Sequence, residues 1–256
     1  MKIISLNTWG GRAGKENLLA FFKTHTDTDI FCLQEIWSAP YEHLEGRSAG
    51  GKSIDHREVM VYGLQEISKI LPNHTAYFRP NHLNNYGLLT LVNKTRTVVD
   101  EGESYVHKYK DYEIPEGEDV GLHARSVQYI TVKKGENNLT VLNFHGLWNG
   151  KGKGDSEDRI VQSQRIISMV KEIPNEIVFC GDFNLLPETR SLKMLEEFGL
   201  SNLISRYGIT STRTSLYTKP DTFADYIFVT KGISVKECRV LPDEVSDHAP
   251  LLIEID

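Results

Sequence analysis

Carboxylates, amides and imidazoles follow several short apolar runs of this sequence, where buried strands are expected to end. Glu35 closes the run IFCLQE, and His145 follows VLNF. Asp182 and Asn184 stand in GDFN, directly after EIVFC. The rest of this polar set comprises Asn7, Asp225, Asp247 and His248. Carboxylate and amide oxygens on a rigid sheet are the ligands that a hard divalent cation prefers, so the pattern predicts a metal site.

Taken singly, each of these residues has an ordinary structural interpretation. An Asn after a strand usually caps a turn, and in Gly-Asp-Phe-Asn the Gly and Asn can take the positive φ of a turn. His145 fits a buried structural histidine, and Asp225 fits a partner for any of the 29 basic side chains. The sequence has no CxxC pair or HExxH for zinc, and no P-loop or GxGxxG for a nucleotide. Only the combination of residues favours a catalytic site.

Together and in this order, the motifs resemble the endonuclease/exonuclease/phosphatase superfamily, which has the deoxyribonuclease-I-like fold. The matching segments run from residue 3 to residue 250 and are SLNTW, LQE, NFHG, GDFN, DYIF and SDHAP. GDFN and SDHAP are specific motifs of this superfamily, whereas SLNTW and LQE are weak signals when taken alone. The resemblance implies an α/β chain folded as a four-layer α/β/β/α sandwich of two mixed sheets, in one domain over residues 1–256. It also implies cleavage of phosphoester bonds with Mg²⁺ or Mn²⁺.

The resemblance assigns one group of residues to the metal and the attacking water. Glu35 is implied as the principal metal ligand, and Asn7 and Asp247 line the same region. Asp182 is implied to position or deprotonate the water. Asn184 is implied to hold the water and the phosphate.

The resemblance assigns a second group to the phosphate. His248 pairs with Asp225 and contacts the scissile phosphate, and His145 donates to a phosphate oxygen. A metal and two imidazoles would stabilise the negative charge that builds on the phosphoryl oxygens. Asp225 beside His248 is expected to raise the pKa of the imidazole. The sequence leaves open whether Asp182 or the His248–Asp225 pair is the base.

Several departures leave the natural substrate open. LLPET and ADYIF stand where inositol-polyphosphate 5-phosphatases have Tyr-Arg and Cys-Asp-Arg segments. The matching stretch of exonuclease-III-type endonucleases is rich in Trp and Arg. Here residues 210–222 contain no Trp, and Arg213 is their one arginine. We also expect neither the disulfides nor the export signal of secreted deoxyribonuclease I. GDFNLLPET is similar to segments of deadenylases, tyrosyl-DNA phosphodiesterases and many bacterial members.

Five further residues are candidates for substrate contacts. Asn85 lies in a polar loop, and Arg125 would reach a phosphate or pair with an acid, with pairing slightly favoured. Trp148 would either stack on a base or pack under a loop. Lys151 and Lys153 are expected to add mobile positive charge at the rim.

Composition limits the type of partner. The 256 residues are 39% hydrophobic and 25% charged, as in a globular domain, and the net charge of −6 argues against a protein that coats nucleic acid through a basic face. The expected partner is a compact phosphoester substrate, such as a short single strand, a nucleic-acid end or a small phosphodiester. The three cysteines suggest buried free thiols and a cytoplasmic location. Stable membrane association and an obligate protein partner are not expected.

The favoured function is a Mg²⁺-dependent phosphodiesterase rather than a monoesterase. One alternative is a phospholipid phosphodiesterase similar to the neutral sphingomyelinases, which would need an exposed hydrophobic hairpin. Another alternative is a binding module that kept the fold and lost the chemistry.

Alternating strands and helices must position these residues. Helical spacing of apolar residues predicts helices over Glu16–Lys23, Arg57–Leu71, Asp158–Ile173 and Ser191–Phe198. Apolar runs predict strands over Lys2–Asn7, Ile30–Gln34, His74–Arg79, Gly87–Asn93, Ser104–Tyr109, Ala124–Val132, Leu139–Phe144, Glu176–Cys180, Ala224–Val229 and Pro250–Ile255. Residues 133–138 read as a hairpin turn. Tyr41–Asp55 and Gly150–Glu157 are expected to be exposed loops.

Overall fold

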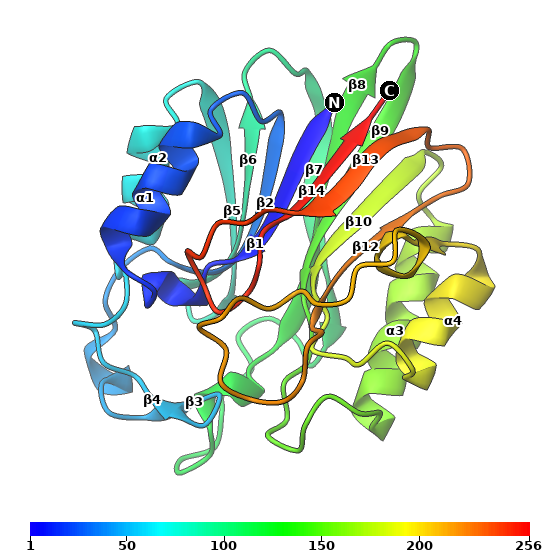
Figure 1. The fold of residues 1–256 in the computed structure, drawn as a ribbon. Coiled ribbons are helices and arrows are strands. Elements are labelled where there is room, and N and C mark those ends of the chain that lie inside the picture. Colours follow the sequence, from blue (N-terminus) through cyan, green and yellow to red (C-terminus); the bar gives the residue numbers. More distant parts are fainter.

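The computed structural model describes all 256 residues and packs two six-stranded sheets face to face (Figure 1). The first sheet has the order β13 (Val235–Val240), β14 (Leu251–Ile255), β1 (Lys2–Asn7), β2 (Ile30–Trp37), β6 (Tyr86–Asn93) and β5 (His74–His82). The second has the order β11 (Ser201–Asn202), β12 (Asp225–Val229), β10 (Glu176–Asp182), β9 (Asn137–His145), β8 (Arg125–Lys134) and β7 (Val98–His107).

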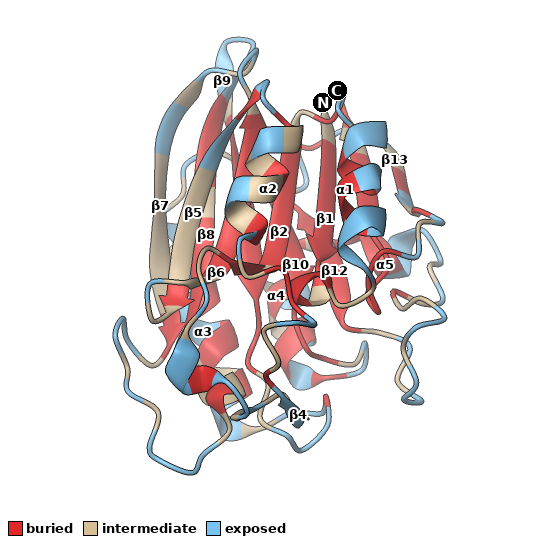
Figure 2. Ribbon diagram, turned by 90° about the vertical axis from the view of Figure 1, so that its left-hand side faces the viewer, coloured by how far each residue is buried: buried red, intermediate tan, exposed pale blue.

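Helices cover the outer face of each sheet, which completes the predicted four-layer α/β/β/α sandwich. The first sheet carries α1 (Lys15–Thr24) and α2 (Gly63–Ile70), and the second carries α3 (Glu157–Lys171) and α4 (Arg190–Phe198) (Figure 1). The short α5 (Leu203–Arg206) packs on β12. Figure 2 shows buried strands throughout the interior and exposed residues on the outer sides of α1 and α2.

The alternation of side chains along β1 and β2 builds two parts of the core. Ile3 and Cys32 face the second sheet and join a cluster of 34 buried residues. Their neighbours Ile4 and Phe31 face the helices and join Phe22 of α1 in a cluster of 17. Because both faces of the sheet are covered, its strands read as nearly continuous apolar runs.

Each sheet contains one parallel strand pair, and both pairs end at the same edge of the sandwich. In the first sheet β1 runs parallel to β2, with Asn7 opposite Gln34. In the second sheet β9 runs parallel to β10, with His145 opposite Asp182, and β12 begins at Asp225, also opposite Asp182. This edge lies at the bottom of Figure 1, away from the two termini. The topology therefore gathers the polar strand ends.

The helix predicted over Arg57–Leu71 is wrong in its first six residues, because α2 begins at Gly63. Residues 57–62 form turns, and the Met60 N–H donates to Gly10 O at 2.7 Å. The apolar side chain of Met60 thus belongs to a contact with the segment after β1. A helical spacing alone could not distinguish that contact from one more helical turn.

The predicted exposed loop Tyr41–Asp55 has structure of its own. It contains a short ribbon of β3 (Ser48–Ala49) and β4 (Lys52–Ser53), and it buries Leu44 and Ile54. Asp119 holds the ribbon by accepting from Ser48 Oγ at 2.7 Å and from the Gly50 N–H at 2.9 Å. The edge strand β13 was not predicted, because the adjacent charged residues Lys236 and Glu237 interrupt the apolar alternation of VKECRV, at the point where the register with β14 shifts. The predicted strand Ser104–Tyr109 is in fact the second half of β7, which ends at His107.

Candidate active site

Asn7 joins the two sheets where the polar strand ends meet. Its Nδ2 donates to Glu35 Oε1 and to Asp182 Oδ2, both at 3.0 Å. Its Oδ1 accepts from the Trp9 N–H at 2.9 Å. Asn7 and Asp182 are buried, so these bonds are shielded from water. One amide therefore fixes two carboxylates from different sheets side by side.

A β-bulge in β2 turns Glu35 toward this point. The pairing register with β6 shifts between Leu33 and Ile36, and Glu35 has a φ of +60°. In a regular strand Glu35 would share the face of Leu33, which packs beneath the helices. Bulges commonly redirect one side chain next to an active site, and here the bulge directs Glu35 to Asn7.

The GDFN segment forms a tight turn that orients Asp182 and Asn184. Asn184 has a φ of +54°, and its N–H donates to Asp182 Oδ1 at 2.8 Å. Its Nδ2 donates to Gly146 O at 3.3 Å. Gly146 is required there, since a Cβ would lie 2.3 Å from Phe183 O. The turn interpretation of GDFN is therefore confirmed, and the turn also serves the polar cluster.

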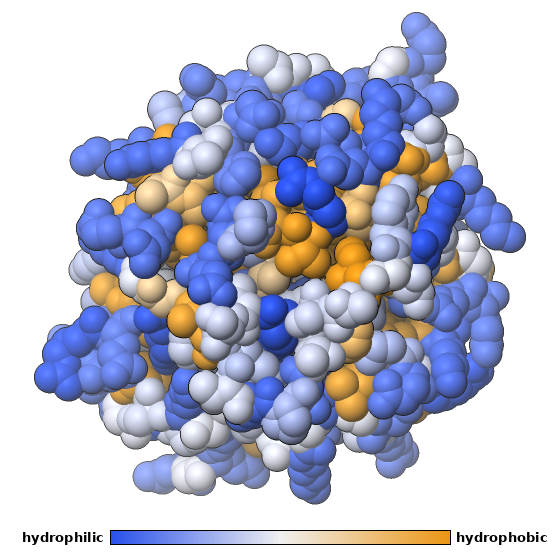
Figure 3. Space-filling model, viewed as in Figure 1, coloured by the Kyte–Doolittle hydropathy of each residue, from blue (hydrophilic) through white to orange (hydrophobic).

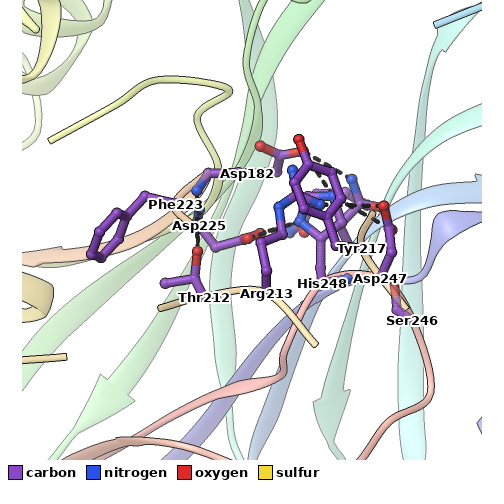
Figure 4. A network of polar contacts seen from close by, with 12 residues as sticks. Asp182, Thr212, Arg213, Tyr217, Phe223, Asp225, Ser246, Asp247 and His248 are labelled. Atoms are coloured by element: carbon purple, nitrogen blue, oxygen red, sulfur yellow. Dashed lines mark hydrogen bonds and ion pairs between the residues drawn. The ribbon is translucent and has the colours of Figure 1, made fainter. Parts of the chain in front are cut away.

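His248 connects Asp225 to the same cluster (Figure 4). Its Nδ1 lies 2.8 Å from Asp225 Oδ2, and its Nε2 lies 3.6 Å from Asp182 Oδ2. His145 Nε2 approaches that Asp182 oxygen at 3.7 Å and Glu35 Oε1 at 4.0 Å. Two imidazoles and two carboxylates thus converge on one small volume.

Asp247 adds a third carboxylate beside His248. Its Oδ2 lies 3.4 Å from Arg213 Nη1. Its Oδ1 lies 3.9 Å from His248 Nε2 and is buried without a hydrogen-bond partner. Buried polar atoms nearly always have partners, so this oxygen is suited to a ligand.

Burial governs the charges of the cluster. It raises the pKa of Asp225 to about 7, against the opposing effect of Arg213. Burial, together with Arg213, lowers the pKa of His248 to about 4. Burial and Arg213 therefore outweigh the rise in the His248 pKa that was expected from Asp225. Burial also raises the pKa of Glu35, and the nearby Asp247 and Asp182 raise it further.

The cluster forms the floor of a pocket of about 280 Å³. We define the floor as the six cluster residues that line the pocket, namely Glu35, His145, Asp182, Asn184, Asp247 and His248. Trp148 lines the same pocket. Asn85 does not line it, and the Nδ2 of Asn85 donates to Pro40 O at 3.4 Å.

Arg125 also lines the pocket, but it does not pair with an acid. It is 1% exposed, and its Nη2 donates to Gly121 O at 2.8 Å. Its Nε and Nη1 are buried without partners. The slightly favoured interpretation of Arg125 as an ion-pair residue is therefore wrong, and an anion in the pocket would be its natural partner.

The family model described as "Endonuclease/Exonuclease/phosphatase family" matches residues 4–248. The chain belongs to the endonuclease/exonuclease/phosphatase family. Members of this family are hydrolases that act on phosphoester bonds. The catalytic chemistry expected of this chain is therefore phosphoester hydrolysis.

Several solved structures share the whole fold at low sequence identity. A functionally unknown conserved protein from Enterococcus faecalis V583 is 18% identical, with a TM-score of 0.73 over 100% of this chain and 99% of its own. A mannosyl-6-phosphatase from Bacteroides thetaiotaomicron VPI-5482 is 16% identical, with a TM-score of 0.71 over 100% and 99%. D. rerio TDP2 complexed with a single-strand DNA product is 16% identical, with a TM-score of 0.69 over 100% and 98%.

A curated relative matches only part of this family member. A UPF0294 protein from Vibrio parahaemolyticus is 29% identical over 115 residues. The match spans 45% of this chain and 39% of the relative.

Sequence reasoning missed or misjudged several pocket residues of this family member. His123 and Tyr217 line the pocket from loops, and no sequence pattern indicated them. His82 lines it from the end of β5. Trp9 also lines it, and its position beside Asn7 in SLNTW was an available signal. Lys153 was expected to be mobile at the rim, yet it is only 7% exposed.

Proposed function

We propose that this family member is a metal-dependent phosphodiesterase that hydrolyses a short single strand, a nucleic-acid end or a small phosphodiester by attack of water. The observation that supports it most directly is the convergence of Glu35 and Asp182 with His145 and His248 Nε2 within 4.0 Å. Charge builds on the phosphoryl oxygens during hydrolysis, and this arrangement surrounds them with donors and a cation site.

The residues present fit a divalent metal. Glu35, Asn7 and Asp247 would hold Mg²⁺ or Mn²⁺. Burial raises the pKa of Glu35, the nearby Asp247 and Asp182 raise it further, and the Oδ1 of Asp247 lacks a partner. A cation would stabilise the ionised carboxylates and give that oxygen a partner. When bound, the metal would neutralise charge on the phosphate oxygens.

A second donor set overlaps the first. Asp182, Asp225 and His248 each offer a ligand atom within 4.8 Å of the others. We favour the set around Glu35, because His248 Nδ1 already bonds Asp225 at 2.8 Å and that pair is suited to proton transfer.

The other floor residues would handle the water and the phosphate. Asp182 and Asn184 would orient the water, and His145 would donate to a phosphate oxygen. Two groups are placed to receive the water's proton, namely Asp182 and the Nε2 of His248. Asp225 would orient His248 through Nδ1 and stabilise its cation once the proton arrives.

A compact substrate is supported by size and by the relatives. The pocket volume of about 280 Å³ lies near the lower end of ligand sites, which begin at roughly 300 Å³. One structural relative was solved with a single-strand DNA product, and another is named as a sugar phosphatase. We also propose that residues 1–256 form one catalytic domain, since a core cluster extends from Ile3 to Ile255. The buried free thiols support the expected reducing, cytoplasmic location.

The alternatives have less support. None of the helices combines the length and apolar character that a membrane span requires. A phospholipid enzyme would need a hydrophobic hairpin, but the exposed large apolar residues are scattered (Tyr62, Val99, Tyr109, Tyr207 and Leu216). The face in Figure 3 is mostly hydrophilic, with small hydrophobic areas between polar side chains. A silent binding module is disfavoured by the intact polar cluster.

The test is turnover of bis(p-nitrophenyl) phosphate and of thymidylyl-thymidine by the purified chain. We expect hydrolysis with Mg²⁺ or Mn²⁺, none with EDTA, and a slower rate on p-nitrophenyl phosphate. Sphingomyelin vesicles test the phospholipid alternative. Absence of metal-dependent turnover on every diester would overturn the proposal and leave the binding module.

A further inference from the structure

One wall of the pocket, beside the floor, is formed by Lys153, Arg213 and Tyr217. Two of these three side chains carry a positive charge. Lys153 Nζ donates to Tyr217 Oη and to Phe223 O, both at 3.1 Å. The Arg213 guanidinium carbon lies 4.0 Å from the centroid of the Tyr217 ring, and Lys153 Nζ lies 4.8 Å from it. Figure 4 shows Arg213 and Tyr217 next to His248 and Asp247. All three line the pocket that contains the floor.

The protein neutralises the positive charges of this group only in part. Lys153 is 7% exposed, and its Nζ bonds only the neutral oxygens of Tyr217 and Phe223, although a buried lysine is normally paired with a carboxylate. The Arg213 side chain is also 7% exposed, and its Nε is buried without a partner. Its one carboxylate, Asp247 at 3.4 Å, is among the proposed metal donors. Lys153 therefore has no carboxylate within ion-pair distance, and Arg213 shares its one carboxylate with the proposed metal site.

The backbone around the group is fixed, so the charges are held in place. Lys153 O accepts from the Leu186 N–H at 3.0 Å. Asp155 accepts from the Arg190 and Ser191 N–H groups at 2.6 and 3.0 Å, which ties the same loop to α4. Arg213 forms an isolated antiparallel β-bridge with His248. A rigid pair of cations loses little entropy when an anion binds.

We infer that Lys153 and Arg213 form a second anion subsite, which takes a phosphate group neighbouring the one that is hydrolysed. The subsite rests on the proposed function only for the role of the first phosphate. One small pocket contains both subsites, so the two phosphates belong to one compact molecule. A phosphorylated strand end has this chemistry. Lysine and arginine are the usual phosphate partners, and Tyr217 acts as a positioning residue.

A simpler role for Lys153 is to tie residue 153 to the loop of Phe223. That role needs hydrogen bonds but no charge, so substitutions separate the two. Lys153→Met removes both, Lys153→Gln keeps a donor without the charge, and Lys153→Arg keeps the charge. Lys151→Met is the matched control, because Lys151 is an exposed lysine of the same loop that does not line the pocket.

The kinetic test compares thymidylyl-thymidine with its 5′- and 3′-phosphorylated forms in Mg²⁺. We expect the parent enzyme to prefer one phosphorylated form. Lys153→Met and Lys153→Gln should lower kcat/KM for that form by about 10- to 100-fold, as for a lost bond to a charged group, with little change for thymidylyl-thymidine. Lys153→Arg and Lys151→Met should keep the preference. Equal losses on all substrates, or no loss, would overturn the subsite.

A binding test separates the subsite from the catalytic proposal. Calorimetry would compare thymidine 3′,5′-bisphosphate with thymidine 5′-monophosphate. Tighter binding of the bisphosphate, lost in Lys153→Gln, supports the subsite even if no diester is hydrolysed, and only the proposed function would then fail. Turnover without any advantage for the second phosphate would overturn the subsite alone. Absence of both turnover and the binding difference would overturn both.

Discussion

The floor and the wall of the pocket are held by different kinds of structure. In the floor, Glu35, His145 and Asp182 stand on strands and are fixed by sheet register, by a bulge and by Asn7. In the wall, Lys153, Tyr217 and Arg213 stand on loops and are fixed by hydrogen bonds between those loops. Loops on a rigid scaffold vary without disturbing it. The floor should therefore determine the rate, and the wall should determine which phosphoester binds.

The largest effect is expected at His248 in the floor. His248→Ala should lower kcat by about two to four orders of magnitude, the range of a positioned acid–base group. Asp225→Asn should cost less, because it removes the group that orients the imidazole and leaves the imidazole in place. Steady-state kinetics on bis(p-nitrophenyl) phosphate measure both.

The double variant tests whether His248 and Asp225 act as one unit. Its kcat should be close to that of His248→Ala alone, since losses within one unit are not additive. Additive losses would mean that the two residues act separately, and would weaken the picture of a single connected floor.

A loss of comparable kind is expected at Glu35. Glu35→Gln keeps an acceptor for Asn7 but removes the charge that holds a hard cation. A metal supplies several kcal/mol, so kcat should fall by about 10³-fold, and rates should respond weakly to Mg²⁺. Undiminished activity at ordinary Mg²⁺ would contradict the assignment of Glu35.

The Glu35→Gln variant should lose activity but keep or gain stability. Burial and like charges raise the pKa of Glu35, so without metal its ionised form destabilises the folded protein above the unfolded pKa. Metal-free Glu35→Gln should melt at or above the temperature of the parent at neutral pH. A clearly lower melting temperature would show that the carboxylate is structural.

The floor could be predicted from sequence more fully than the wall. Asp182 and His145 close apolar strands, and parallel pairing brings strand ends to one edge, so their meeting followed from pattern and resemblance. The orientation of Glu35 did not follow, because a bulge between Leu33 and Ile36 leaves no mark in the hydrophobic pattern.

Lys153 was named as a candidate substrate contact, but its buried place in the wall was not predicted, because loops position residues by contacts that no hydrophobic period encodes. Lys153 lies in GKGKGDSE, a composition typical of an exposed loop, yet its Nζ lies buried beside Phe223, 70 positions away. At Met60 a helix was predicted where the chain forms turns, since the apparent helical spacing reflects a contact with Gly10. In both cases a long-range contact outweighed the local signal.

A moderate effect of pH is expected from the wall. Burial, with Arg213, lowers the pKa of Lys153 to about 8, while Tyr217, Asp182, Asp225 and Asp221 also face it. Nζ therefore loses its proton as pH rises through about 8, well before an exposed lysine would. KM for a phosphorylated dinucleotide should rise about tenfold between pH 7 and 9.5, by the usual worth of a charge-assisted bond. A flat profile in the parent enzyme would contradict this prediction.

Lys153→Arg is the control for that profile. Arginine stays charged throughout this range, so the rise of KM should disappear while kcat keeps its own pH dependence. A rise that persists in Lys153→Arg would assign it to another group, and Lys153 would no longer distinguish the wall from the floor.

The smallest expected effect is the response to monovalent salt. A net charge of −6 and a subsite of two side chains inside the pocket leave few phosphate contacts for a long strand. With two contacts, at Lys153 and Arg213, a single-strand slope of about −0.7 per contact predicts a rise of KM of about sevenfold between 50 and 200 mM salt. Removing one contact in Lys153→Gln should reduce that rise to about threefold, by the same slope. An enzyme that binds duplex DNA through six to ten contacts would instead lose about 10³-fold or more in affinity over this range.

KM measured for a short phosphorylated oligonucleotide and for a long duplex across the salt series checks both slopes. Efficient cleavage within the duplex, with a steep slope that Lys153→Gln leaves unchanged, would place substrate recognition on a surface outside the pocket wall.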